Sequence, residues 1–142
     1  MNKEIKFPDK NLELVIREAT NKINGEPIYI NDLKKIFELH IESKDITDIT
    51  GIEYCTNLKK LYIWGNNITD IEPLSKLVSL EELCFGESKI TDLESISRLI
   101  NLKELYLWIN KTVDVKPISK LTNLKKIYIG EHEVSLRDIE FF

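Results

Sequence analysis

The sequence has little cysteine, little glycine and few histidines, and it contains no long hydrophobic run. Its 142 residues include two Cys, five Gly and two His. No stretch approaches the ~18 apolar residues of a membrane-spanning helix. The starting segment MNKEIKFPDKNLELVIREAT has no apolar region of signal-peptide length. With Met1 as the natural start, we therefore expect a cytoplasmic protein that does not bind membranes; if a native signal peptide precedes the printed sequence, we expect a secreted one.

The charge balance and the scarce residues argue against several other classes of protein. Lys and Arg total 20 against 24 Asp and Glu, giving a formal net charge of -4. A nucleic-acid-binding domain usually has a basic patch or a high pI, whereas the pI here is about 5.3. The glycines form no phosphate-binding loop, and Cys55 and Cys84 lack the C-x-x-C spacing of metal sites. We expect no nucleic-acid partner, no metal and no cofactor.

What the sequence does contain is an ungapped repeat, in which similar residues recur every 22 positions. One apolar column comprises Ile36, Leu58, Leu80, Leu102 and Leu124. A unit of this length cannot bury its apolar side alone, so successive units are expected to stack over a shared core. The other apolar columns are Leu39, Leu61, Leu83, Leu105 and Ile127; Ile41, Ile63, Phe85, Leu107 and Ile129; Ile46, Ile68, Ile90, Thr112 and Val134; Ile49, Ile71, Leu93 and Val115; Ile52, Leu74, Ile96 and Ile118; and Cys55, Leu77, Leu99 and Leu121.

The segment LKKLYIWGN, residues 58–66, has the spacing L-x-x-L-x-L-x-x-N. This spacing resembles the leucine-rich repeat, whose units have 20–29 residues. The segment ITDI-x-P-L, residues 68–74, is similar to the bacterial internalin-like subclass of these repeats. The resemblance implies an α/β leucine-rich-repeat solenoid, with a short parallel β-sheet on the concave face and an N-terminal helical cap.

The repeat predicts one domain over residues 1–142. We expect residues 1–29 to form the N-terminal helical cap and residues 30–134 to form about five repeats. Residues 135–142 should form a short C-terminal cap, because the repeat pattern breaks there and apolar residues follow, namely Leu136, Ile139, Phe141 and Phe142.

The N-terminal cap contains one segment with helical spacing, residues 9–23. Pro8 and Asp9 are typical of a helix start, and Asn24 with Gly25 is typical of a helix end. The apolar stripe of this helix is expected to cover the open core of the first repeat, and it comprises Leu12, Val15, Ile16, Ala19 and Ile23.

Two polar columns accompany the apolar ones. Short side chains just after the Ile/Thr turn can cap the backbone amides that follow, and this column comprises Asp48, Asp70, Asp92 and Asp114. Asn66 and Asn110 occupy the asparagine position of the repeat, where other units have Lys44, Ser88 and His132. We expect weaker local hydrogen bonding in the units that lack asparagine.

Side chains alternate along a strand, so with Leu61 and Ile63 inward, residues 60, 62 and 64 face outward. Both tryptophans and three of the five tyrosines then fall in two adjacent outward columns. Aromatic residues favour strands and can cover one another, but Trp and Tyr are also enriched at binding hot spots. We predict a partner-binding site on this face, made of Tyr62, Trp64, Glu82, Cys84, Gly86, Glu104, Tyr106, Trp108, Lys126 and Tyr128.

The outward face also predicts a slot with an acidic rim. Trp64 and Trp108 are two strands apart, about 10 Å, and Gly86 lies between them. The indoles would wall a slot with a glycine floor unless the rings tip inward and close it. The carboxylates in or beside the outward columns would attract a basic or polar partner; they are Glu38, Glu42, Glu82, Glu87, Glu104, Glu131 and Glu133.

Catalytic arrangements are not evident in the sequence. His40 and His132 are four repeats apart, about 19 Å across a sheet. Cys84 has no evident cationic neighbour to lower its pKa. His40 shares a face with Glu38 and Glu42, but such a set on one strand is usually solvated surface. We therefore expect a protein that is not an enzyme.

The sequence thus predicts a non-catalytic, monomeric module that binds a protein partner through an aromatic and acidic concave face. A soluble inhibitor fits this pattern, as a toxin immunity protein or a counter-defence protein of a mobile element. The alternatives are a secreted or surface adhesion fragment of internalin type, and a saccharide-binding module, because aromatic walls with carboxylates also suit sugars.

Overall fold

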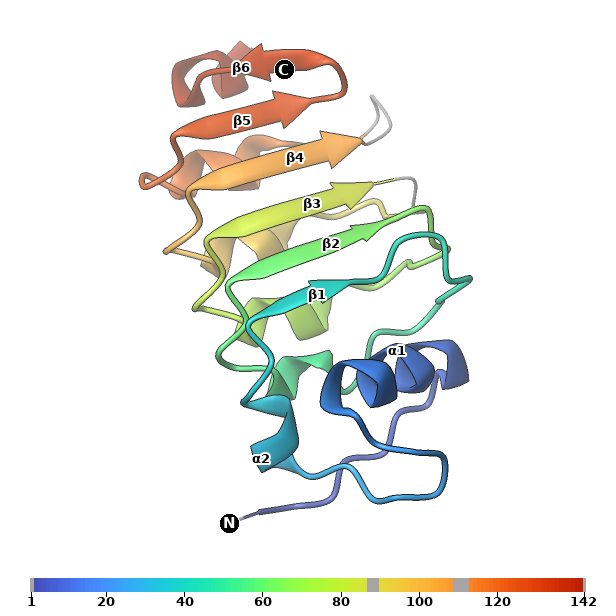
Figure 1. Ribbon diagram of the computed structural model, residues 1–142. Coiled ribbons are helices and arrows are strands. Elements are labelled where there is room, and N and C mark those ends of the chain that lie inside the picture. The colour runs from blue at the N-terminus through green and yellow to red at the C-terminus, as the bar shows by residue number, and fades with distance from the viewer. Residues whose placement is uncertain (1, 87–89, 109–112, 142) are drawn as a thin grey trace.

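The computed structural model describes residues 2–86, 90–108 and 113–141. Within them, a six-stranded sheet in the order β1-β2-β3-β4-β5-β6 forms one side of a solenoid (Figure 1). Neighbouring strands are parallel from β1 to β5, and β6 pairs antiparallel with β5. The strands are β1 (Glu38–His40), β2 (Lys60–Trp64), β3 (Glu82–Gly86), β4 (Glu104–Trp108), β5 (Lys126–Ile129) and β6 (His132–Val134). The architecture is the expected leucine-rich-repeat solenoid.

The return half of each unit runs through a short 3-10 helix on the side opposite the sheet (Figure 1). These helices are Ile52–Tyr54, Glu72–Lys76, Glu94–Arg98 and Lys116–Lys120. The aspartate column caps the turns that lead into them: Asp70 Oδ1 accepts a hydrogen bond from the Glu72 amide at 2.9 Å, and Asp92 Oδ1 accepts one from the Glu94 amide at 2.8 Å. Asp48 and Asp114 make the equivalent bonds to Thr50 and Lys116. The predicted role of this column is confirmed.

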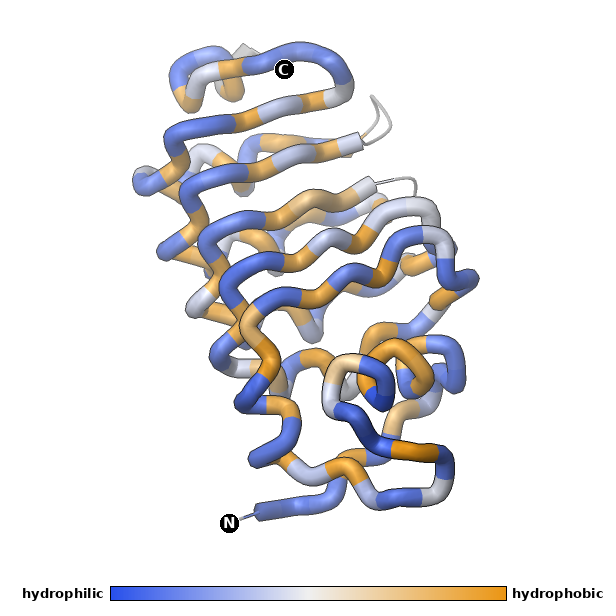
Figure 2. Tube along the Cα trace, viewed as in Figure 1, coloured by the Kyte–Doolittle hydropathy of each residue, from blue (hydrophilic) through white to orange (hydrophobic). Residues whose placement is uncertain are grey.

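The core lies between the sheet and the 3-10 helices and continues from unit to unit. Leu61, Ile63, Leu83 and Phe85 are fully buried, and hydrophobic and polar residues alternate along the strands (Figure 2). Burial of the apolar strand positions is the main stabilising contribution of each unit. The predicted apolar columns are confirmed for the described residues except Val134, which belongs to a hairpin at the C-terminal end; Thr112 lies outside the described residues.

The N-terminal cap is built around α1 (Lys10–Thr20), followed by α2 (Ile30–Leu33). Asp9 is the N-cap of α1, as predicted, and accepts a hydrogen bond from the Asn11 amide at 2.9 Å. The other oxygen of the same carboxylate accepts from the Thr47 amide at 2.8 Å, which ties the helix start to the first repeat. In the described part of the chain, no helix combines the length and the apolar character needed to span a membrane.

The end of α1 differs from the prediction. The helix ends at Thr20 because Asn21 adopts a left-handed conformation with φ 55°, which ends it before Asn24 and Gly25. Leu12, Val15 and Ile16 are buried as expected. Ala19 and Ile23 were wrongly placed in the apolar stripe: Ala19 is exposed, and Ile23, beyond the helix, is 72% exposed.

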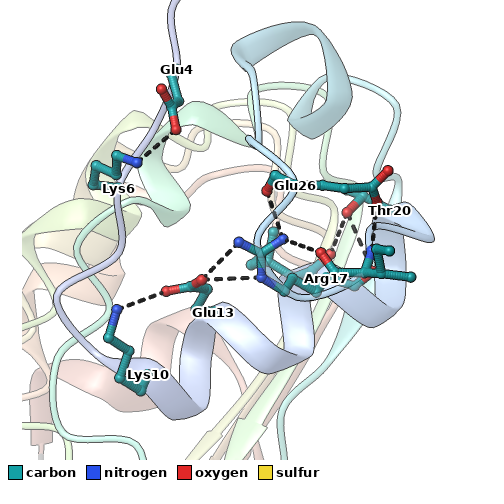
Figure 3. A network of polar contacts seen from close by, with 9 residues as sticks. Glu4, Lys6, Lys10, Glu13, Arg17, Thr20 and Glu26 are labelled. Carbon is teal, nitrogen blue, oxygen red and sulfur yellow. Dashed lines mark hydrogen bonds and ion pairs between the residues drawn. The ribbon is translucent and has the colours of Figure 1, made fainter.

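A single arginine side chain holds the loop that follows α1 (Figure 3). Arg17 donates hydrogen bonds through Nη1 to the carbonyl oxygens of Ile23 and Glu26, each at 2.8 Å. Its Nε donates to Glu13 Oε1 at 3.0 Å. The loop is therefore anchored to the helix by polar contacts instead of the apolar contact expected from Ile23.

The C-terminal end of the solenoid is a hairpin rather than another repeat turn. Gly130, with φ 64°, lies between β5 and β6, and Val134 pairs back with Ile127. The prediction that Val134 repeats the position of Ile46 is therefore wrong. A 3-10 helix, Leu136–Phe141, follows. Leu136 packs against the core and Ile139 is buried, as expected of the cap, while Phe142 and the side chain of Phe141 lie outside the described residues.

Candidate partner-binding face

The outward face of the sheet consists of columns of side chains in strict register. Tyr62 is paired with His40 on one side and with Cys84 on the other, and Tyr106 lies between Cys84 and Tyr128. The alternation predicted for β2 holds, since Leu61 and Ile63 are buried, Tyr62 is half-buried and Trp64 is exposed. Of the predicted site residues, the register thus brings Tyr62, Cys84, Tyr106 and Tyr128 into one continuous row.

The rings of this row form two stacked pairs. His40 stacks on Tyr62 with ring centroids 4.5 Å apart and an interplanar angle of 13°. Tyr106 stacks on Tyr128 with centroids 5.3 Å apart and an angle of 10°. Cys84 on β3, which is half-buried, separates the two pairs. The row of rings is therefore interrupted at β3, where Cys84 lies between Tyr62 and Tyr106; we call this position the interruption.

The tyrosine hydroxyls are directed at carboxylates. Tyr62 donates to Glu82 Oε1 at 2.9 Å, and Tyr106 donates to Glu104 Oε2 at 3.1 Å. Tyr128 donates to Glu133 Oε2 at 3.3 Å. Burial, together with the hydrogen bond to Glu104, raises the pKa of Tyr106 to about 12. Burial raises the pKa of Tyr62 as well, so Tyr62 and Tyr106 are neutral donors that orient the carboxylates of Glu82 and Glu104.

The two tryptophans are the exposed apolar residues of the sheet. Trp64 is 38% exposed and Trp108 is 48% exposed, at the ends of β2 and β4. Gly86, which is in register between them, is buried, and a Cβ added to it would lie 2.5 Å from the Trp108 carbonyl oxygen. The predicted slot with an open glycine floor is therefore wrong, because β3 packs too closely against β4 at this point.

The acidic character of the face is clearest on β1. His40 Nε2 lies 2.8 Å from Glu38 Oε1, and His40 Nδ1 lies 3.3 Å from Glu42 Oε1. The hydrogen bond to Glu38, and less strongly that to Glu42, raises the pKa of His40 above its ordinary value of 6.5. Glu131 and Glu133 are exposed beyond β5, and Glu87 lies outside the described residues.

This raised pKa predicts a pH dependence of stability. Because the folded-state pKa of His40 is above the unfolded value, its stabilisation is fully present below about pH 6.5 and is lost as the pH rises through the folded-state pKa. The ring is exposed, so the effect should stay below about 1 kcal/mol. Urea unfolding at about pH 5.5 and 8.5 should show that wild type loses more stability than His40→Gln. Glu38→Gln should have an intermediate dependence, and identical pH profiles for wild type and His40→Gln would contradict the assignment.

The thiols of the chain are poorly suited to nucleophilic chemistry. Burial raises the pKa of Cys84, and the carboxylates of Glu42 and Glu82 raise it further. Burial also raises the pKa of Cys55 to about 12. Both cysteines are free, and the described residues hold no group of three or more metal-binding side chains. That the protein is not an enzyme remains a prediction.

A polar groove at the opposite edge of the sheet was not predicted. It has a volume of about 460 Å³ and lies where the strands begin, lined by Lys59, Ser79, Glu81, Asn101, Lys103, Asn123 and Lys125. Glu81 lies 3.8 Å from the Lys59 ammonium and 3.6 Å from that of Lys103. These are exposed pairs, which contribute little on their own. The sequence signal for this groove is the column one residue before each strand, which lies outside the outward-facing columns.

Comparison with known proteins agrees with this geometry. A family model described as leucine-rich repeats in two copies matches residues 34–75 and again residues 56–98. The fold is similar to the crystal structure of an internalin from Listeria monocytogenes, with a TM-score of 0.81 and 39% sequence identity over 91% of this chain. This chain is an internalin-like leucine-rich-repeat protein. It spans 38% of the length of that Listeria internalin.

A second solved structure similar to this internalin-like protein contains the CBM51-2 and INT domains of ZmpB from Clostridium perfringens. Its TM-score is 0.55, and it is 33% identical over 61% of this chain and 18% of the other. No curated protein matches the chain. Internalin-type leucine-rich-repeat folds generally serve as protein-interaction modules, and stacked repeats of this kind present extended concave surfaces to their ligands.

Proposed function

We propose that this internalin-like protein binds another protein through the outward face of its sheet, as a monomer and without catalysis. The single observation that carries the proposal is the exposure of Trp64 and Trp108 beside the tyrosine row. Large aromatic side chains at the centre of a surface are the groups that most often dominate binding energy. Scattered exposed apolar residues would need no explanation, but these belong to one continuous surface.

The charges of the face favour a basic or polar epitope. Glu38, Glu82 and Glu104 recur at the first position of their strands, and Glu131 and Glu133 extend the acidic region beyond β5. Complementary charge accelerates encounter and orients the partner more than it increases affinity. The more specific role that we propose is that of a soluble cytoplasmic inhibitor, which covers a basic surface of its partner. An extracellular adhesion partner is the alternative.

The proposal is tested by capture from a lysate of the native host, read by mass spectrometry. The bait proteins are wild type, Trp64→Ala with Trp108→Ala, and a matched control, Val78→Ala with Ile100→Ala. Val78 and Ile100 are exposed apolar residues in the turns before β3 and β4, away from the outward face. We expect the tryptophan pair variant to lose more than about 100-fold in affinity for a protein that wild type and control both retain.

Circular dichroism of the three proteins should be the same, because the indoles are exposed. Unfolding of the tryptophan variant would instead assign the indoles a structural role and would contradict the proposal. Equal capture by all three proteins would move the binding site away from this face. If the wild type retains no protein but binds a glycan array through the tryptophans, the saccharide alternative replaces the protein partner.

A further inference from the structure

The two aromatic stacks join β1 to β2 and β4 to β5, and β3 between them carries Cys84 in place of an outward-facing ring. Tyr62 stacks toward β1 and Tyr106 stacks toward β5, and the residue between them is Cys84. β2 and β4 are two strand spacings apart, about 10 Å. A planar group held between two rings needs about 7 to 8 Å, which is two contacts of 3.5 to 4 Å. Two strand spacings across Cys84 exceed this requirement, so the interruption has room for one flat side-chain group.

The interruption is flanked by carboxylates. Glu82 is two residues before Cys84 on β3, and Glu104 is its in-register neighbour on β4. Two like charges directly opposite on adjacent strands repel each other, so a cation placed between them would be stabilised. Burial raises the pKa of the Cys84 thiol and the carboxylates of Glu42 and Glu82 raise it further, which agrees with a negative potential at the interruption.

The cations that the chain itself supplies satisfy these carboxylates only in part. Lys60 Nζ lies 3.9 Å from Glu82 Oε2, with half of the lysine side chain exposed. Lys126 is in register with Glu104 on its other side. A long ion pair between exposed groups contributes little, so an incoming cation with better geometry would compete successfully for these oxygens.

We propose that the partner inserts an arginine side chain between Tyr62 and Tyr106, over Cys84, with its guanidinium bound by Glu82 and Glu104. Arginine is favoured over lysine because the guanidinium is planar, stacks on aromatic faces and has several N–H donors in a fixed fork. The proposal rests on the proposed function and names the side chain that the face recognises. The tryptophans then form the apolar border of this arginine site.

Cys84 provides a probe at the proposed site, because it is half-buried while Cys55 is fully buried. The full chain is treated with a cationic trimethylammonioethyl and an anionic sulfonatoethyl methanethiosulfonate, and both rates are normalised to free cysteine. We expect Cys84 to prefer the cationic reagent by about tenfold or more, as a focused negative potential produces. Glu82→Gln with Glu104→Gln should abolish most of this preference. Glu4→Gln with Glu18→Gln, which changes the net charge equally at exposed sites in the N-terminal cap, should preserve it.

A second measurement tests the guanidinium directly. Acetyl-arginine amide at tens of millimolar should slow the reaction of Cys84 with a neutral maleimide about twofold or more, as expected of a ligand with millimolar affinity. The neutral isostere acetyl-citrulline amide should not slow it. No charge preference, equal protection by both amides, or a Cys84 that reacts with neither reagent would each overturn the arginine site.

The arginine site and the proposed function can fail separately. If the tryptophan variant loses the partner while the Glu82 and Glu104 variant binds it normally, the face is the binding site and the arginine proposal is wrong. If arginine protects Cys84 but no protein is captured, the arginine site is supported and the protein-binding proposal is not.

Discussion

Asn66→Ala is expected to lower the free energy of unfolding by about 3 to 4 kcal/mol, because it leaves buried backbone groups without partners. Asn66 is only 2% exposed. Its Oδ1 accepts hydrogen bonds from the amides of Lys44 at 3.0 Å and Ile46 at 3.1 Å. Its Nδ2 donates to the Ile41 carbonyl oxygen at 2.5 Å. Urea unfolding at constant pH measures the change.

The conformation of the turn at residues 43–46, which Asn66 holds by hydrogen bonds, explains why the expected loss of stability is large. Ser43 and Asp45 have positive φ values of 51° and 55°. Such conformations are unfavourable for residues other than glycine and persist only where surrounding contacts hold them. Alanine at position 66 removes the hydrogen bonds to this turn. Because position 66 is buried, bulk water does not replace them.

Asn67→Ala is the matched control, since Asn67 is the adjacent asparagine and is exposed. We expect this variant to change the free energy of unfolding by no more than about 0.5 kcal/mol. A loss below about 1 kcal/mol for Asn66→Ala would show that relaxation or water replaces the side chain. The asparagine position would then not be the support of the turn.

The strand half of each unit could be predicted from the sequence because its determinants are local. Leu61 and Ile63 alternate with Tyr62 and Trp64, and the period of the repeat fixes which strand lies beside which. The aspartate column was equally predictable, because each side chain caps an amide two residues further along the same turn. Sequence spacing alone determines such contacts.

The partners of the aromatic side chains could not be predicted from spacing. Tyr62 has two in-register neighbours, and which of them its ring approaches depends on its rotamer; it stacks on His40. The same holds for Tyr106, which stacks on Tyr128. Residues 130–134 fit either another repeat or a hairpin, and the left-handed conformation of Gly130 gives the hairpin. The close packing of Gly86 against Trp108 likewise depends on the distance between strands rather than on their order.

Gly86→Ala is expected to lower the free energy of unfolding by about 1 to 3 kcal/mol, the usual range for overpacking a well-packed site. The added Cβ would lie 2.5 Å from the Trp108 carbonyl oxygen and 2.8 Å from its Cα. Backbone atoms of a central strand cannot move aside as the end of a flexible side chain can. Thermal or urea unfolding measures the loss. In a Trp64→Phe background, a shift in tryptophan emission reports the displacement of Trp108.

A Trp108→Ala background distinguishes two causes of this loss of stability, namely contact with the β4 backbone and contact with the indole of Trp108. The atoms that a Cβ at position 86 would meet are the Cβ, carbonyl oxygen and Cα of Trp108, and all three remain in Trp108→Ala. We therefore expect Gly86→Ala to cause the same loss in a Trp108→Ala background, within the ~0.5 kcal/mol of independent substitutions. A smaller loss there would show that the indole, and not the β4 backbone, occupies the space above Gly86. Equal losses would mean that glycine at this position sets the distance between β3 and β4, and with it the position of an exposed tryptophan of the binding face.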